Sequence, residues 1–344
     1  MGHSVVDNAW VAHRSLRRGV AVVASMTLLA GLLTVVAESV GDRRRRMRPS
    51  TLSRKITLQR SLASASVLLV VALIAGVRPT ASAGATPSGP GYWTAAADGG
   101  VFSYNVPFLG SAANEAPTAP IVGIAFDRAT ATGSSAYYLV TTDGEAFACS
   151  STCAYYAGGS LPRGTDARIV GIATVAHGYW LVDSSGVVFP FGDASPHGSL
   201  QGDRLNAPVV GIASTRDGGG YWLVASDGGV FSFGDARFAG SLGGDHLDSP
   251  IVGIASDPAG SGYWLVGGDG GVFTFGGARF YGSTGSIHLN APVVGIAPTT
   301  SGSGYWLAAS DGGIFSFGDA PFEGSAGGTH LDQPMVGVTS PPPA

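Results

Sequence analysis

From residue 91 onward, short apolar runs alternate with glycine-rich polar segments at a nearly constant interval. One period contains IVGIA (251–255), YWLV (263–266), VFTF (272–275) and RFYG (279–282), and each run is expected to form a strand. The segments SDPAGSG, GGDGG and GGA separate these runs, and STGSIHLNAP leads to the next period. Four short strands in roughly 42 residues match the length of one blade of a β-propeller.

Two sequence markers count the repeats. The first is a tyrosine that recurs after 45 residues once and after 42 residues four times: Tyr92, Tyr137, Tyr179, Tyr221, Tyr263 and Tyr305. The second is a V-G-I or V-G-V tripeptide that begins at Val122, Val170, Val210, Val252, Val294 and Val336. Six copies therefore span residues 91–340, which predicts an all-β, six-bladed β-propeller of four-stranded repeats.

The V-G-I strands are expected to lie innermost. The strands are apolar at nearly every position, as is typical of sheets that are covered on both faces. A glycine in mid-strand weakens the strand unless a neighbouring backbone must come close, as it must where the innermost strands converge. This glycine recurs in every copy: Gly123, Gly171, Gly211, Gly253, Gly295 and Gly337.

The two ends of the array are complementary. The first copy begins at Gly91 with its second strand, and the last copy ends with a first strand, 335–338, that lacks its own partners. Pairing this C-terminal strand into the first blade would close the propeller and remove two exposed sheet edges. Residues 341–344 form a Pro-rich tail.

The N-terminal region carries two apolar runs, 19–37 and 66–77. The first has about the 20 residues that a membrane-spanning helix needs. The second follows basic residues and precedes Ala81-Ser82-Ala83, a combination typical of a secretory signal peptide. We therefore interpret 47–85 as a signal that starts at Met47, 1–46 as a spurious upstream extension and 86–90 as a linker. The alternative is two membrane helices, in which case the basic block 43–60 stays inside. Both interpretations predict a secreted or cell-surface chain that meets the membrane only through its N-terminal segment.

The charges divide at about residue 90. Twelve basic and three acidic residues precede it, for a net charge of +9, whereas seven arginines and 20 acidic residues follow it, for a net charge of −13. Nucleic acid binding requires clustered Lys and Arg, so the repeat region is not expected to bind nucleic acid. A monomer is expected.

The only two cysteines, Cys149 and Cys153, lie four positions apart in copy two. In an exported chain such a close pair is typical of a local disulfide. A zinc site would require two further ligands at suitable spacing, and none is nearby. No metal site is therefore expected here.

The stretch GYWLVASDGGVFSFGDA (220–236), followed by HL[DN]xP and VGIA, resembles a propeller-type repeat of secreted actinobacterial proteins, which in some of them stands beside cell-wall hydrolase or protease domains. The resemblance covers residues 91–340 and implies the propeller fold and export, but no common activity. Copy two departs furthest, with Tyr138 in place of the tryptophan and the cysteine pair in place of F-G-D. It is either a specialised lip or a degenerate copy braced by a disulfide, and we favour the second interpretation.

Aspartates in the Asp-Gly turns form the first candidate set. A ring of carboxylates at one rim could hold Ca²⁺ through oxygen ligands. Alternatively, each aspartate accepts a hydrogen bond from its own turn while glycine supplies the positive φ, and the recurrence of the turn favours this structural role. The set comprises Asp227, Asp269 and Asp311, with Asp98, Asp143 and Asp183 at related places.

A second candidate set lies in the connections between copies: Arg204, His246, His288 and His330, each two residues before Asn or Asp. Side chains on successive blades should lie too far apart to share a zinc ion, whose bonds are about 2.1 Å long. We interpret them as a polar rim that binds a glycan.

The tryptophans are expected to pack between blades, although flat aromatic faces can also stack on sugars. They are Trp93, Trp180, Trp222, Trp264 and Trp306. Phe231, Phe233 and their equivalents are interpreted in the same way.

No nucleophile elbow, HExxH, P-loop or dinucleotide fingerprint is found in the sequence. The predicted function is an extracellular binding or adhesion module that recognises polysaccharide, cell-wall glycan or protein through its loop-bearing rim. One alternative is a secreted glycan hydrolase or lyase with rim carboxylates, and it would gain support if Glu115, Glu145 and Glu323 converged on the axial channel. The other alternative is a structural scaffold without a ligand.

Overall fold

The computed structural model describes residues 90–127, 136–156, 161 and 166–341, which belong to one compact unit, Ser82–Ala344. The expected signal or membrane segments (1–46 and 47–85), most of the linker and most of the Pro-rich tail lie outside the described residues. Within these described ranges, no helix is long and apolar enough to cross a membrane.

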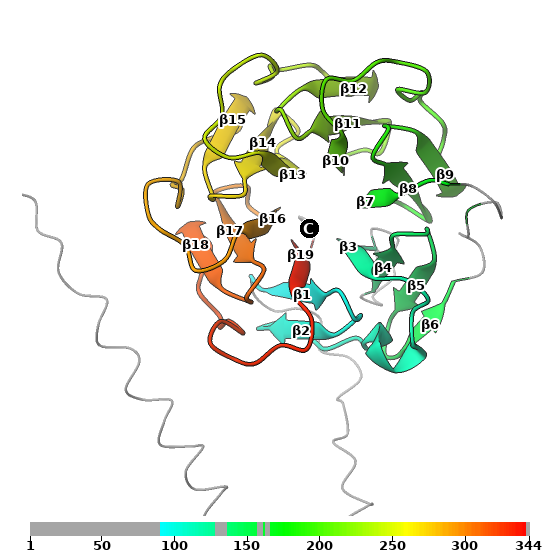
Figure 1. Ribbon diagram of the computed structural model, residues 1–344, viewed down its shortest axis with the longest axis vertical. Coiled ribbons are helices and arrows are strands. Elements are labelled where there is room, and N and C mark those ends of the chain that lie inside the picture. Colours follow the sequence, from blue (N-terminus) through cyan, green and yellow to red (C-terminus); the bar gives the residue numbers. More distant parts are fainter. Residues whose placement is uncertain (1–89, 128–135, 157–160, 162–165, 342–344) are drawn as a thin grey trace, which may run out of the picture. The chain divides into compact units, whose positions relative to one another are not determined.

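Six antiparallel sheets build the unit, and Figure 1 shows them arranged around a common axis, as in a propeller. Each sheet, together with the segment that follows it, is called a blade. The strands of the six blades, in spatial order from the axis outward, are as follows: blade 1, β19 (Met335–Thr339), β1 (Tyr92–Ala96) and β2 (Val101–Tyr104); blade 2, β3 (Ile121–Phe126), β4 (Tyr137–Thr141), β5 (Ala146–Cys149) and β6 (Cys153–Tyr155); blade 3, β7 (Ile169–Val175), β8 (Gly178–Asp183) and β9 (Val188–Gly192); blade 4, β10 (Val209–Ser214), β11 (Gly220–Ala225) and β12 (Val230–Gly234); blade 5, β13 (Ile251–Ser256), β14 (Gly262–Gly267) and β15 (Val272–Gly276); blade 6, β16 (Val293–Pro298), β17 (Gly304–Ala309) and β18 (Ile314–Gly318).

The chain's last strand completes the sheet that contains its first. Strand β19 pairs antiparallel with β1, with Trp93 opposite Thr339 and Thr94 opposite Val338. It also contacts the innermost strands of both neighbouring blades, β16 and β3. The all-β class is confirmed, since the described residues form strands, turns and one short 3₁₀ helix, η2 (Ala112–Glu115).

The mid-strand glycines lie where innermost strands approach one another. A Cβ on Gly123 would lie 3.1 Å from Ile172 Cγ2, and one on Gly337 would lie 3.4 Å from Ile124 Cγ2. The valine before the glycine forms a bulge, because the pairing register slips between Val209 and Gly211 and at the equivalent place in the other copies of blades 2 to 6. The innermost placement predicted for V-G-I is confirmed.

Aromatic side chains pack between adjacent blades. The ring of Trp180 lies 4.9 Å from that of Tyr221 in the next blade, and Trp306 lies 5.0 Å from Tyr92 of blade 1. Burial raises the pKa of Tyr221 to about 12, so its phenol stays protonated and donates to Gly198 O. All five repeat tryptophans are buried, which confirms their predicted core role. Phe231 and Phe233 are half-buried against the same core.

The prediction of a fourth strand at 279–282 is wrong, since this segment is not part of a sheet. Side chains bind its backbone instead: Trp264 Nε1 donates to Arg279 O at 2.8 Å, and Tyr305 Oη donates to Gly282 O at 2.6 Å. Gly282 also has a φ of +136°, which is outside the β region. Blades 1, 3, 4 and 6 likewise have three strands in their sheets, so within the described residues only blade 2 has four.

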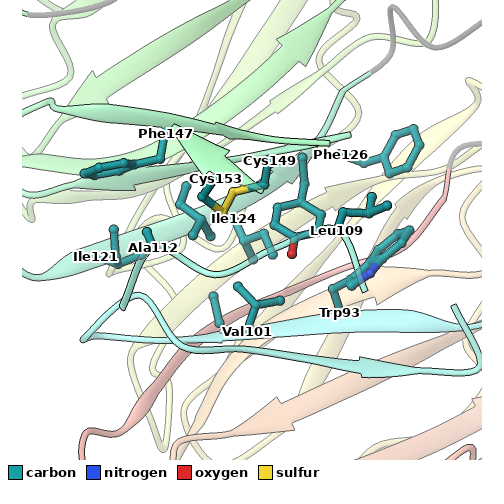
Figure 2. Packing of buried hydrophobic residues seen from close by; sticks show 13 residues of the cluster. Trp93, Val101, Leu109, Ala112, Ile121, Ile124, Phe126, Phe147, Cys149 and Cys153 are labelled. Atoms are coloured by element: carbon teal, nitrogen blue, oxygen red, sulfur yellow. A yellow bond between two sulfur atoms is a disulfide. The ribbon is translucent and has the colours of Figure 1, made fainter. Parts of the chain in front are cut away.

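Blade 2 gains its fourth strand through the cysteine pair. Cys149 and Cys153 form a disulfide, as predicted, and face each other across the β5–β6 hairpin. Figure 2 shows this bond inside a buried cluster with Leu109 and Trp93 of blade 1. The disulfide therefore belongs to the hydrophobic core between blades 1 and 2.

Candidate functional site

The two ends of the sheets differ in chemistry. At one end, the Asp-Gly turns meet the connections between blades: Leu242 N donates to Gly228 O, and Ile251 N donates to Ser226 O, both at 2.9 Å. We call this end the loop rim. The opposite end carries the turns from the innermost strand to the second strand in blades 3 to 6, and we call it the cavity end. The connection that carries His246 is thus held at both of its ends by the turn that contains Asp227.

The turn aspartates accept hydrogen bonds from the backbone of their own turns. The backbone N–H groups of Gly229, Gly271 and Gly313 donate to Asp227, Asp269 and Asp311, two residues earlier, at 2.9–3.0 Å. The intervening Gly228 has a φ of +80°, which L-residues rarely adopt. These contacts are those of the structural role favoured by the sequence. Among the residues that the structure describes, no three His, Cys, Asp or Glu side chains are grouped so that they could hold a metal ion.

A leucine anchors each of four connections between blades. Leu205, Leu247, Leu289 and Leu331 pack partly buried against the core. The residues on either side of each leucine are exposed, so they point away from the core. The exposed residue before each leucine is one of the predicted set, Arg204, His246, His288 and His330, and an exposed Asn or Asp follows it. The structure places these four side chains on separate connections, one per blade junction.

Exposed phenylalanines lie on the same connections and were not singled out from the sequence. Phe238, Phe280 and Phe322 are 58–61% exposed and occupy one repeat position on the segments that precede His246, His288 and His330. Phe108 takes this position in blade 1 at 55% exposure. The available signal was a phenylalanine that recurs after Arg or Pro in the segment expected to form the fourth strand. The segments after the third strands of blades 4, 5 and 6 thus each carry one exposed phenylalanine and, eight residues later, one exposed histidine.

The three copy-specific glutamates do not converge. Glu115 ends the 3₁₀ helix η2 after blade 1, and Glu323 lies exposed on the outer segment of blade 6. Glu145 lies in the β4–β5 turn at the loop rim, where its Oε2 and Asp143 Oδ2 lie 3.2 and 3.1 Å from Thr118 Oγ1. None of the three lines the axial cavity. The condition that would have favoured a glycan-cleaving enzyme is therefore not met.

An axial cavity of about 370 Å³ opens at the cavity end. Its wall combines an apolar ring, a ring of alanines and, farther along the innermost strands, Ser and Thr; the apolar ring comprises Ile124, Ile172, Ile212, Ile254, Ile296 and Val338. Arg216 and Asp257 also line it. None of the predicted site residues does, because all of them lie at the other end of the strands.

Asp257 and Gly277 depart from the repeat together. In blades 4 and 6 the residue after the innermost strand is threonine, and Thr215 and Thr299 donate to Asp235 and Asp319, which follow the third strand, at 3.0 and 2.8 Å. Blade 5 has Asp257 at the threonine position and Gly277 at the aspartate position. In blade 5 the carboxylate thus comes from the residue after the innermost strand, and its oxygens accept from Ala259 N and Ser261 Oγ of the same turn. Comparison of the copies could have revealed this exchange from the sequence.

No family model matches the chain, and no curated protein matches it. Among solved structures, one described as "YCF48 bound to D1 peptide" is similar over 59% of this chain and 80% of that chain, with 11% sequence identity and a TM-score of 0.35. The six sheets around a common axis define a propeller-like repeat protein.

Proposed function

We propose that this chain is an exported binding or adhesion module that recognises a glycan of the cell wall or of the medium through its loop rim. The observation that carries the proposal is the recurrence of an exposed histidine on three successive connections of the loop rim, each preceded along the chain by an exposed phenylalanine on the outer segment. Sugars present apolar faces bordered by hydroxyl groups, so that stacking and hydrogen bonding act together on them. Export rests on the signal-like sequence 47–85 alone.

We interpret the six sheets as a closed propeller in which the pairing of β19 with β1 joins the two ends. Pairing of β19 with β1 and its contacts with β16 and β3 support this interpretation. Closure would hold the connections in a fixed circular order, so that a branched or polymeric glycan could contact several of them at once. Multiple weak contacts to one polymer add up to useful affinity.

Binding to isolated cell-wall polysaccharide and to a printed glycan panel tests the proposal. The triple variant H246A/H288A/H330A should weaken retention about tenfold or more, since each net hydrogen bond contributes roughly 0.5–1.5 kcal/mol. The matched control is His177→Asn, which changes an exposed histidine at the cavity end and suits its φ of +60°. Failure to retain any glycan, or equal retention of the triple variant and the wild-type chain, would overturn the proposal.

A further inference from the structure

One repeat position supplies most of the hydroxyl groups in the axial cavity. It is the third residue after the mid-strand glycine of each innermost strand, and in every blade it lines the cavity. In blade order 1 to 6 it is Ser340, Phe126, Thr174, Ser214, Ser256 and Pro298. Four of the six copies thus carry a hydroxyl, a group that can donate one hydrogen bond and accept two.

Two of these hydroxyls join neighbouring blades. Thr174 Oγ1 of blade 3 donates to Phe126 O of blade 2 at 2.6 Å. Ser340 Oγ, which follows β19 of blade 1, donates to Pro298 O of blade 6 at 2.7 Å. In both cases the acceptor is the carbonyl at the same repeat position of the preceding blade. The role of the hydroxyl in these two copies is therefore structural.

The other two hydroxyls, those of Ser214 and Ser256, have no hydrogen-bond partner among the described residues. Ser214 is only 5% exposed, and both serines line the cavity. Polar groups at such sites are nearly always hydrogen-bonded to protein, water or a ligand. Because the two serines belong to adjacent blades, 4 and 5, they place two available hydroxyls on one side of the cavity.

The surrounding wall narrows the chemistry of a ligand. Ile212 and Ile254 line the cavity two residues before these serines, and residues at that spacing in a strand point to the same side. The Asp257 carboxylate accepts hydrogen bonds from Ala259 N and Ser261 Oγ of its own turn, so it does not require a cationic ligand. The net charge of −13 after residue 90 disfavours an anion. A neutral ligand with both hydroxyl groups and an apolar face fits this wall.

We propose that the axial cavity binds one neutral pyranose sugar, either a free monosaccharide or the end of a glycan chain. Hydroxyl groups of the sugar exchange hydrogen bonds with Ser214 and Ser256, and its C–H face lies against the isoleucines. Ligand pockets typically enclose about 300–1,000 Å³, and this cavity encloses about 370 Å³. The site lies at the opposite end of the strands from the loop rim and does not depend on the glycan recognition proposed there.

Calorimetric titration of the purified full chain tests the site with glucose, galactose, mannose and N-acetylglucosamine. At least one of these sugars should bind saturably at one site per chain. Cyclohexanol, a ring with a single hydroxyl, should bind at least about tenfold more weakly than that sugar. The methyl glycosides of the four sugars distinguish the two sources: retained binding assigns a chain end, and lost binding assigns the free monosaccharide.

Substitutions at the two serines test their hydroxyls directly. The S214A/S256A variant should weaken binding of the sugar about tenfold or more, because two hydrogen bonds are lost. Ser256→Thr keeps a hydroxyl at this position, as blade 3 does, and should bind within about threefold of the wild-type chain. Ser232→Ala and Ser316→Ala are the matched controls, since these serines lie on third strands and do not line the cavity. They should bind the sugar as the wild-type chain does.

Thermal unfolding supplies a second measurement. Without sugar, S214A/S256A should keep the wild-type midpoint, because no hydrogen bond of the folded chain is lost. Thr174→Val should lower the midpoint, since it removes the hydrogen bond to Phe126 O. Saturating sugar should raise the midpoint of the wild-type chain and raise that of S214A/S256A less.

The inference is overturned if no sugar saturates, if cyclohexanol binds as tightly as the best sugar, or if S214A/S256A binds that sugar as the wild-type chain does. The loop-rim variant H246A/H288A/H330A should bind the sugar normally. Conversely, S214A/S256A should keep its retention on cell-wall polysaccharide if that retention depends on the loop rim. These two variants distinguish the failure of the cavity site from the failure of recognition at the loop rim.

Discussion

Blades 2 and 5 fill the same interior position with different chemistry. In blade 5, Phe275 pairs with Tyr263, and their ring centroids lie 5.4 Å apart. A Cβ added to Gly240 of the preceding blade would lie 2.5 Å from this phenyl ring, so glycine is required there. In blade 2 the residue opposite the repeat tyrosine is Cys149, whose disulfide lies in the same core cluster. The position opposite the repeat tyrosine can therefore be filled by a phenyl ring, as in blade 5, or by a disulfide, as in blade 2.

The outer segments of the two blades differ for the same reason. In blade 5, the indole of Trp264 binds Arg279 O and holds the segment without a strand ladder. Tyr138 replaces this tryptophan in blade 2 and has no indole N–H to donate. There the outer segment is strand β6, which pairs with β5. Backbone pairing and a covalent bond thus take the place of one side-chain hydrogen bond.

The largest expected effect on the free energy of unfolding is at Trp264, compared with its counterpart Tyr138 in blade 2. Trp264→Ala should lower the free energy of unfolding by about 3–5 kcal/mol, because it leaves a cavity and frees the carbonyl of Arg279. Tyr138→Ala should cost at least about 1 kcal/mol less, since blade 2 does not use that hydrogen bond. Urea denaturation of both variants measures the difference. An equal or larger cost for Tyr138→Ala would show that the blades depend on this position alike.

Removal of the disulfide should have the next largest effect. The C149A/C153A variant should lose about 2–4 kcal/mol of unfolding free energy, as is typical when a cross-link and its buried sulfur atoms are lost. Dithiothreitol should shift the denaturation midpoint of the wild-type chain in the same direction. The double variant supplies the control, because no cysteine remains in it and the reductant should leave its midpoint unchanged.

The glycines of the innermost strands should differ between the two blades in how much a substitution by alanine lowers stability. Gly123→Ala in blade 2 would place a Cβ 3.1 Å from Ile172 Cγ2 and 3.2 Å from Val140 Cγ1. Gly253→Ala in blade 5 would meet Val266 Cγ1 at 3.4 Å, an ordinary contact. Overpacking costs roughly 1–3 kcal/mol, so the blade 2 variant should be the less stable in thermal unfolding. The reverse order would contradict the assignment of these glycines to close approach.

The smallest effect is expected at the turn aspartates. Asp269→Ala removes the hydrogen bond from Gly271 N and should cost about 1 kcal/mol. Asp143→Ala in blade 2 removes the acceptor of the Thr141 hydroxyl and should cost a similar amount. Thermal unfolding with and without Ca²⁺ completes the test. A Ca²⁺-dependent midpoint in the wild-type chain that is lost in Asp269→Ala would replace the structural role with a metal-binding one.

The charged residues that line the axial cavity could not be identified from the sequence, because they do not recur in a common motif. His246, His288 and His330 can be identified because they recur in one motif. Arg216 and Asp257, in contrast, come from adjacent copies and lie in unlike local contexts. Only comparison of Asp257 and Gly277 with the Thr and Asp pairs of blades 4 and 6 indicates that a charge has been relocated. Even this comparison does not reveal that the relocated charge lines a cavity.

The amino-acid sequence by itself determined the number of copies, three strands of each copy, the buried tryptophans and the disulfide. These features depend on local periodicity and residue type, and six copies repeat the evidence. The tertiary structure decided the state of the outer segment, because aromatic side chains of the same blade and of the next one bind its backbone. It also decided where the axial cavity opens, since residues that converge on an axis are distant along the chain and only packing brings them together.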